Sequence, residues 1–292
     1  MGYWHWAGPC ANLVPVTSDD VSRPPLDRSA LETLGADLDV EVLETAPSTN
    51  AAAAERARAG AAEGLVVVAE HQTAGRGRLD RSWESPARSA LTFSLVLRPT
   101  LPAADWPWLP LLTGHTIAKA LRAAGYADAV VKWPNDVLLG ADKVAGILVE
   151  RIETPSGPAA VVGVGLNVTL TREELPVPTA TSLLLARGAA ADRTALLVDV
   201  LRSLREAYDV WQAGGPDATA HLRSSYAAAC DTVGREVRVD LPTGDVLTGR
   251  ATGIDAAGRL LVQGPAGETV VGAGDVVHVR SVGSGAAPGD DQ

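Results

Sequence analysis

The chain has 292 residues and a formal net charge of −10, from 25 Lys and Arg side chains against 35 Asp and Glu side chains. Hydrophobic residues make up 46% and charged residues 21% of the chain, which is ordinary for a globular protein and excludes a mostly disordered one. The acidic balance argues against non-specific nucleic-acid binding, which needs a basic face, and we expect no nucleic-acid partner.

The first half of the chain alternates short apolar runs with one alanine-rich stretch. Residues 28–34 have a weak helical pattern. Ser48 and Thr49 precede the alanine run of 51–59, and a Ser or Thr in that place is typical of a helix start. Strands are predicted over 40–46, 64–70 and 91–99, with a polar loop rich in Gly and Arg over 71–89.

The second half begins with mixed elements and ends in β structure. In chain order, its predicted elements are a helix over 109–124, a strand–turn–strand over 129–153 with the turn at 140–142, an antiparallel strand over 159–170, and helices over 194–213 and 216–229. From 234 to 280, short β-rich runs alternate with glycine-containing turns, which is typical of a small all-β module.

These elements predict an α+β fold in two parts. A mixed or antiparallel sheet packed by helices would occupy 28–231, and the small β module would occupy 232–282. Residues 1–27 show no helical period, so we expect a disordered extension there and a disordered tail over 283–292.

No feature of the sequence indicates export or a membrane. No apolar run is long enough to cross a bilayer, and the N-terminus lacks the basic region and apolar core of a signal peptide. The two cysteines, Cys10 and Cys230, form neither a disulfide framework nor a metal cluster. We therefore expect a cytoplasmic protein without a membrane partner, with Cys230 as a small apolar residue near a helix end.

The segment 75–81, of sequence GRGRLDR, concentrates positive charge in an acidic protein. It lacks the G-x-x-x-x-G-K-[ST] pattern of a P-loop, and Asp80 replaces the third glycine of a dinucleotide-binding pattern. Guanidinium forks and mobile backbone N–H groups suit phosphate and carboxylate groups. A solvated basic loop is the alternative, but this charge density between two predicted strands favours a binding site.

Two of the only three lysines flank one predicted hairpin. They are Lys132 and Lys143, whereas Lys119 lies on a predicted helix and is expected at the surface. The run from Lys132 to Asp136 also brings an amide, Asn135, and a carboxylate together. An Asx turn at a hairpin corner is the alternative interpretation. Because lysine is so rare in this chain, its placement here favours a site.

Gly163 and Gly165 are spaced two residues apart on a predicted strand. This spacing leaves one strand face bare, so a flat ring or ligand could lie there; tight packing against a helix is the alternative. No Ser-His-Asp or nucleophilic Cys arrangement is present in the sequence. Cations around a Gly-rich loop without a nucleophile favour the joining of anions, such as a carboxylate and a nucleotide α-phosphate, over hydrolysis.

Five motifs in this order resemble the biotin protein ligases. They are Ser48–Asn50, Gln72–Arg78, Lys132–Asp136, Lys143–Glu150 and Gly163–Asn167. The resemblance implies a class II aminoacyl-tRNA-synthetase-like catalytic domain followed by a small SH3-like β-barrel. It also implies that biotin and Mg²⁺-ATP give biotinyl-5′-AMP and pyrophosphate. The biotinyl group then passes to one lysine of an apo biotin carboxyl carrier domain of an acyl-CoA carboxylase.

The resemblance also assigns roles to residues of this sequence. Biotin would contact Ser48, Thr49, Asn50, Gln72, Arg76, Gly77, Arg78 and Lys143. ATP and the adenylate would contact Arg76, Arg78, Trp83, Lys132, Asn135, Lys143 and Asn167. The expected catalytic residues are Lys143, Arg78 and Asp136. Lys143 would hold the biotin carboxylate and the α-phosphate, and Asp136 would orient or deprotonate the acceptor lysine and bind Mg²⁺.

Two alternatives stay open within this resemblance. A lipoyl or octanoyl ligase of similar fold would use a similar frame. A biotin-sensing DNA-binding regulator would need a winged helix-turn-helix, for which the first 27 residues are too short. The family pattern has a glycine at the place of Asp80, which affects how the loop closes. We expect a monomer or a weak homodimer.

Overall fold

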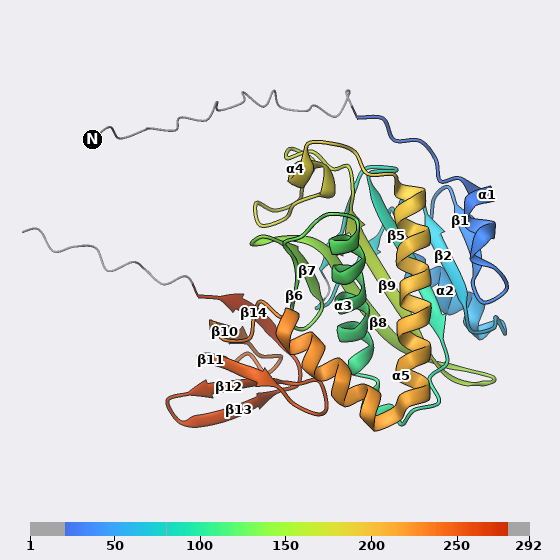
Figure 1. The fold of residues 1–292 in the computed structure, drawn as a ribbon. Helices are drawn as coiled ribbons and strands as arrows, with labels where there is room; N and C mark the ends of the chain where they lie inside the picture. Colours follow the sequence, from blue (N-terminus) through green and yellow to red (C-terminus); the bar gives the residue numbers. More distant parts are fainter. Residues whose placement is uncertain (1–20, 80, 280–292) are drawn as a thin grey trace, which may run out of the picture.

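The computed structural model describes residues 21–79 and 81–279, and the predictions for 1–20, Asp80 and 283–292 lie outside the described residues. Within these residues the chain forms a large mixed sheet with helices and a smaller antiparallel sheet near its C-terminal end (Figure 1). The predicted α+β fold is confirmed.

The large sheet has seven strands in the order β1-β2-β5-β9-β8-β7-β6. Its neighbouring strands are antiparallel except for β1 and β2, which are parallel. The strands are β1 (Asp39–Leu43), β2 (Leu65–Ala69), β5 (Ala90–Leu97), β6 (Ala129–Lys132), β7 (Asp136–Leu139), β8 (Asp142–Thr154) and β9 (Gly157–Asn167). The helices are α1 (Arg28–Leu31), α2 (Thr49–Arg58), α3 (Trp108–Ala123), α4 (Leu183–Arg187) and α5 (Arg193–Ala229), with 3₁₀ turns at Glu32–Leu34 and Ala103–Asp105.

Both faces of the central strands β2, β5 and β9 are buried, which explains the continuous apolar runs of these strands. Side chains of a strand alternate between faces, and β2 divides accordingly. Val66 and Val68 belong to the main core, which includes α3 and α5, while Leu65 and Val67 belong to a second core beneath α2. Figure 1 shows α3 and α5 side by side on one face. The alanines of α2 let that helix lie close to the opposite face.

One predicted element differs from the structure, and one predicted helix break agrees with it. The strand–turn–strand over 129–153 is three strands, because residues 133–135 form a turn between β6 and β7. The predicted break between the helices over 194–213 and 216–229 is confirmed: α5 consists of two helical segments that meet at a kink at Gly215, where φ is 52°. Glycine adopts this positive φ without a steric penalty, and Pro216 follows as a favourable first residue of the next helical segment.

Residues 21–27 are ordered against the large domain, so the expectation of a disordered extension is wrong for this stretch. Leu26 is 5% exposed, and its backbone N–H donates to Glu70 Oε1 at 2.6 Å. Glu70 forms a buried ion pair with Arg193, at 2.7 Å, and Arg193 also donates to the carbonyl of Pro24. Arg23 pairs with Glu174 nearby. The segment therefore covers a buried ion pair that would otherwise meet solvent.

The smaller sheet has five antiparallel strands in the order β13-β12-β11-β10-β14. They are β10 (Glu236–Asp240), β11 (Val246–Ile254), β12 (Leu260–Gly264), β13 (Gly267–Val271) and β14 (Asp275–His278). Trp133, just after β6, joins the two sheets: its backbone N–H donates to Thr232 Oγ1 and its indole N–H to the carbonyl of Gly258. None of the helices in the described part of the chain combines the length and apolar character needed to cross a bilayer.

Candidate functional site

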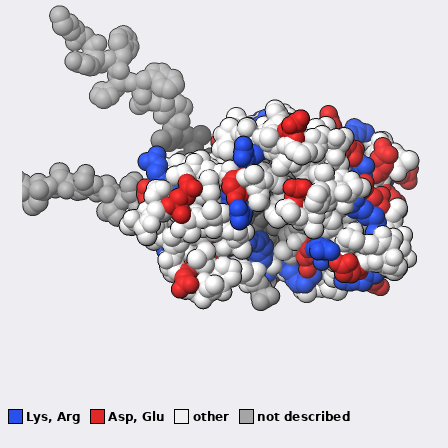
Figure 2. Space-filling model, turned by 90° about the horizontal axis from the view of Figure 1, so that it is seen from below, with Lys and Arg blue, Asp and Glu red and all other residues white. Residues whose placement is uncertain are grey.

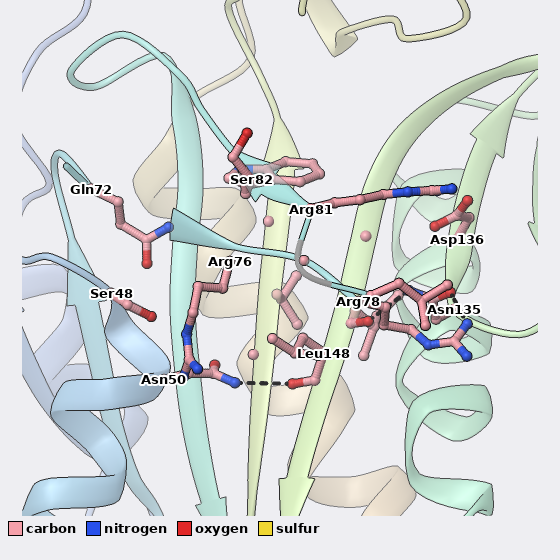
Figure 3. A pocket seen from close by; sticks show the side chains of 18 of the residues that line it. Ser48, Asn50, Gln72, Arg76, Arg78, Arg81, Ser82, Asn135, Asp136 and Leu148 are labelled. Atoms are coloured by element: carbon pink, nitrogen blue, oxygen red, sulfur yellow. Dashed lines mark hydrogen bonds between the residues drawn. The ribbon is translucent and has the colours of Figure 1, made fainter. Parts of the chain in front are cut away.

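A pocket lies where the loop rich in Gly and Arg (residues 71–89, called the Gly/Arg loop below) crosses the ends of α2, β7, β8 and β9 (Figure 3). Short strands β3 (Gly75–Arg76) and β4 (Ser82–Trp83) pair to form the root of this loop. The predicted site residues that line the pocket are Ser48, Thr49, Asn50, Gln72, Arg76, Gly77, Arg78, Trp83, Asn135, Asp136 and Lys143. Figure 3 shows uncharged groups such as Ser48 and Gln72 on one side, with Arg78, Asn135 and Asp136 on the other.

The uncharged end of the pocket is a network of hydroxyl and amide groups at the start of α2. The backbone N–H and the hydroxyl of Thr49 both donate to Gln72 Oε1, at 2.7 and 3.0 Å. Gln72 thereby caps a helix whose N-cap residue, Ser48, makes no side-chain cap of its own. The buried hydroxyl of Ser94, on β5, donates to Asn50 Oδ1 at 2.6 Å. These contacts fix the orientation of the predicted biotin-binding groups.

Glu150, on β8, links this network to the loop. Asn50 Nδ2 donates to Glu150 Oε2 at 2.7 Å. It also donates to the carbonyl of Leu148 at 3.2 Å, the bond that Figure 3 shows. Arg76 Nη2 donates to both carboxylate oxygens of Glu150 at 3.2 Å. Sequence reasoning missed Ser94 and Glu150 as site residues. The signal for Glu150 was its place as the last residue of the motif that begins at Lys143.

The bare strand face predicted at Gly163 and Gly165 exists, and the protein's own side chains occupy it. A Cβ on Gly163 would lie 1.9 Å from Asn50 Oδ1, and one on Gly165 would lie 2.3 Å from Trp83 Cε2. The indole of Trp83 is therefore the flat ring over Gly165, whereas the amide of Asn50 fills the space at Gly163. Trp83 Nε1 is buried without a hydrogen-bond partner among the described residues, and the ring centroid of Trp83 lies 5.8 Å from Lys143 Nζ.

The opposite end of the pocket is charged. Lys143 Nζ lies 2.6 Å from Asp136 Oδ1, as an ion pair without the alignment of a hydrogen bond. Arg78 Nη1 donates to Asn135 Oδ1 at 3.0 Å, and Asn135 Nδ2 donates to the carbonyl of Ile147 at 2.8 Å. Burial lowers the pKa of the Arg78 guanidinium, while the charge of Asp136 opposes that shift. Two cations beside one carboxylate give this end a net positive charge suited to anions.

Two predicted residues do not line the pocket. Asn167 is buried at the end of β9, where its Nδ2 donates to the carbonyl of Thr181 at 3.0 Å. Lys132 ends β6 next to the C-terminal sheet. Burial, together with the charge of Lys132, lowers the pKa of His278 on β14 to about 4. Within the described residues, no group of three His, Cys, Asp or Glu side chains is arranged to hold a metal ion.

Comparisons with known proteins point to one family. Residues 42–167 match the biotin/lipoate A/B protein ligase family, and residues 232–279 match the biotin protein ligase C terminal domain. The chain is 41% identical over 275 residues to the biotin–[acetyl-CoA-carboxylase] ligase of Mycobacterium tuberculosis, covering 91% of this chain and 100% of that protein. It is 35% identical over 244 residues to the ligase of the same name from Paracoccus denitrificans, covering 80% and 98%.

Among solved structures, a biotin protein ligase from Aquifex aeolicus in complex with biotin and ATP superposes with a TM-score of 0.71 at 27% identity. The match covers 83% of this chain and 99% of that one. The fold, the ordered motifs and these similarities lead to one conclusion: the chain belongs to the biotin protein ligase family.

Proposed function

We propose that this protein activates biotin with ATP to biotinyl-5′-AMP and transfers the biotinyl group to one lysine of an apo biotin carboxyl carrier domain of an acyl-CoA carboxylase. The observation that carries the proposal is a single pocket with an uncharged hydrogen-bonding end and a cationic end. Biotin has the matching polarity, with a neutral ureido ring at one end and a carboxylate at the other.

The uncharged end is the proposed site of the ureido ring. Ser48, Thr49, Asn50 and Gln72 present hydroxyl and amide groups that are already oriented by neighbours. Such preorganisation reduces the entropy lost when a ligand is held. The carboxylate of biotin would then point toward Lys143, which lines the same pocket.

The first step joins two anions, so the pocket must neutralise both. An oxygen of the biotin carboxylate attacks the α-phosphorus of ATP, and pyrophosphate leaves with the electron pair of the broken P–O bond. In our proposal, the ammonium of Lys143 and the guanidinium of Arg78 stabilise the charge that develops on the phosphorus oxygens. Lysine suits this place as a compact charge on a flexible stem, which can turn between Asp136 and a ligand.

The second step needs a neutral amine. The acceptor lysine attacks the carbonyl carbon of biotinyl-5′-AMP, and AMP leaves as the amide bond forms. Once Lys143 has turned to the ligand, the carboxylate of Asp136 is free to orient the acceptor amine or accept its proton. The ion pair between Lys143 and Asp136 supports the proposal that both groups act at the same end of the pocket.

The remaining roles follow from position. We propose that Trp83 packs on the adenine, that Arg76, Gly77 and Arg78 lie over the adenylate, and that Asn135 holds Arg78. Asp136 is the proposed carboxylate for the Mg²⁺ that accompanies ATP, an ion that commonly takes one or two carboxylates and otherwise phosphates and water. Contacts of the nucleotide with Lys132 and Asn167 stay predictions, since neither residue lines the pocket.

We also propose a cytoplasmic protein without a nucleic-acid partner, a monomer or weak homodimer, with a catalytic domain over 28–231 and a β module over 232–282. Figure 2 shows a face on which basic side chains are interspersed with acidic ones, which supports the absence of a nucleic-acid partner. Binding to operator DNA in a gel-shift assay would support the regulator alternative instead.

The test is incubation with an apo carrier domain, biotin and Mg²⁺-ATP, read by intact mass. We expect the carrier to gain the mass of one biotinyl group, and a carrier with its acceptor lysine changed to arginine to gain none. An unchanged wild-type carrier would contradict the proposal. Substrate-dependent ATP–pyrophosphate exchange with biotin and lipoate in parallel separates the biotin ligase from the lipoyl ligase alternative.

A further inference from the structure

A residue of the C-terminal sheet reaches into the pocket. Asp275, the first residue of β14, lines the pocket together with the Gly/Arg loop. Its two carboxylate oxygens accept hydrogen bonds from Arg81 Nη1 and Nη2, at 3.3 and 2.5 Å. Such a bidentate pair fixes the orientation of the guanidinium as well as its distance.

The same end of β14 also contacts a second arginine of the loop. The carbonyl of Gly274 lies 3.5 Å from Arg78 Nη1, which donates at the same time to Asn135. At its tip the loop is closed by the Gly77 N–H, which donates to the carbonyl of Arg81 at 2.6 Å. The loop is thus fixed at its root by the β3–β4 pair and at its tip by β14.

Strand β14 is itself well anchored. It pairs with β10 along Val237–Asp240, and the ring of His278 lies 3.1 Å from Thr232 Oγ1. Thr232 in turn accepts from the backbone N–H of Trp133, next to the charged end of the pocket. The position of Asp275 is therefore set by the body of the protein, and the tip of the loop is attached to that body through Asp275 and Asn135.

We propose that Asp275 is a positioning residue that latches the Gly/Arg loop over the pocket through Arg81 and so slows the escape of biotinyl-5′-AMP between the two steps. The inference rests on the proposed function. The pair is partly open to solvent, with 64% of the Arg81 side chain and 36% of the Asp275 side chain exposed. A pair of this exposure changes a rate by about two- to five-fold, which a chase experiment resolves.

The test measures the release of labelled biotinyl-5′-AMP from the preformed enzyme complex. The variants are Asp275→Asn, Arg81→Gln, the double variant, and Asp275→Glu, which keeps the charge. Asp240→Asn is the matched control, because Asp240 pairs with Arg238 on the same sheet at 2.7 Å and similar exposure, 52% and 39%. Thermal unfolding of each variant records whether the fold is intact.

We expect Asp275→Asn and Arg81→Gln each to release the adenylate about two- to five-fold faster, and the double variant no faster than either. Asp275→Glu and Asp240→Asn should release it at the wild-type rate. The latch proposal would be overturned if Asp275→Asn released biotinyl-5′-AMP at the wild-type rate. It would also be overturned if the effects of Asp275→Asn and Arg81→Gln added up in the double variant. A wild-type enzyme that forms no adenylate at all would instead refute the proposed function itself.

Discussion

A methyl group added at Gly165 should displace Trp83 from the strand face. The new Cβ would lie 2.3 Å from Trp83 Cε2, 2.6 Å from Cζ2 and 2.7 Å from Nε1, all too close for real atoms. The backbone at Gly165 cannot yield, because it is paired with Thr92 on one side and Gly146 on the other. The indole must therefore move.

The expected cost follows from the proposed role of Trp83. Stacking of a base on an aromatic side chain contributes about 1–3 kcal/mol. Loss of this stacking corresponds to about a five- to 150-fold decrease in kcat/KM for ATP, since 1.36 kcal/mol is a factor of ten. Gly165→Ala and Trp83→Ala should fall to similar levels, because each removes the ring from the same place.

The assay is biotin-dependent ATP–pyrophosphate exchange over a range of ATP concentrations. The control is Gly253→Ala on β11, where a Cβ would meet only Leu261 Cδ1, at 4.0 Å, and exchange should stay at the wild-type level. In the Trp83→Ala background, Gly165→Ala should lower kcat/KM for ATP little further, because the new methyl group no longer overlaps an indole ring. A full additional loss in that background would show that the methyl group acts without the indole and would refute the reasoning.

Three further predictions concern charge. Lys143→Ala should lower exchange by about 100-fold or more, since it removes a cation from the reacting phosphate, whereas Lys119→Ala on the exposed side of α3 should not. Glu70→Gln leaves Arg193 buried without its counter-charge and should lower the free energy of unfolding, measured in urea, by about 3 kcal/mol; an unchanged midpoint would contradict this. Because burial lowers the pKa of His278 from 6.5 to about 4, the folded state favours the neutral ring, and its contribution to stability should be lost as the pH falls from 6.5 to 4. Urea unfolding at pH 7 and pH 5 should therefore differ less for His278→Asn than for the wild type.

Local patterns were sufficient for the parts of the site that lie within one element or one turn. The period-two spacing of Gly163 and Gly165 predicted a bare strand face because side chains alternate on a strand. The scarcity of lysine drew attention to Lys143, which the structure places beside Asp136. Each of these signals comes from residues within a few positions of one another.

Contacts between distant segments left no such signal. Asp275 meets Arg81 from 194 positions away, and Ser94 meets Asn50 from another strand. For Asn167 the local pattern was misleading. Its alternation with Gly165 favours the pocket face, but its side-chain amide donates a hydrogen bond to the carbonyl of Thr181 instead. Which side chain occupies a given space depends on packing of the whole domain, which periodicity along the chain does not encode.

The docking of residues 21–27 has a practical consequence for fusion proteins. Leu26, Pro24 and Arg23 bond to Glu70, Arg193 and Glu174. A purification tag or a targeting domain joined directly at residue 28 would delete these bonds and open the buried Glu70–Arg193 pair to water. A tag attached ahead of residue 21 keeps the segment in place, so that junction is the one that preserves the stability of the enzyme.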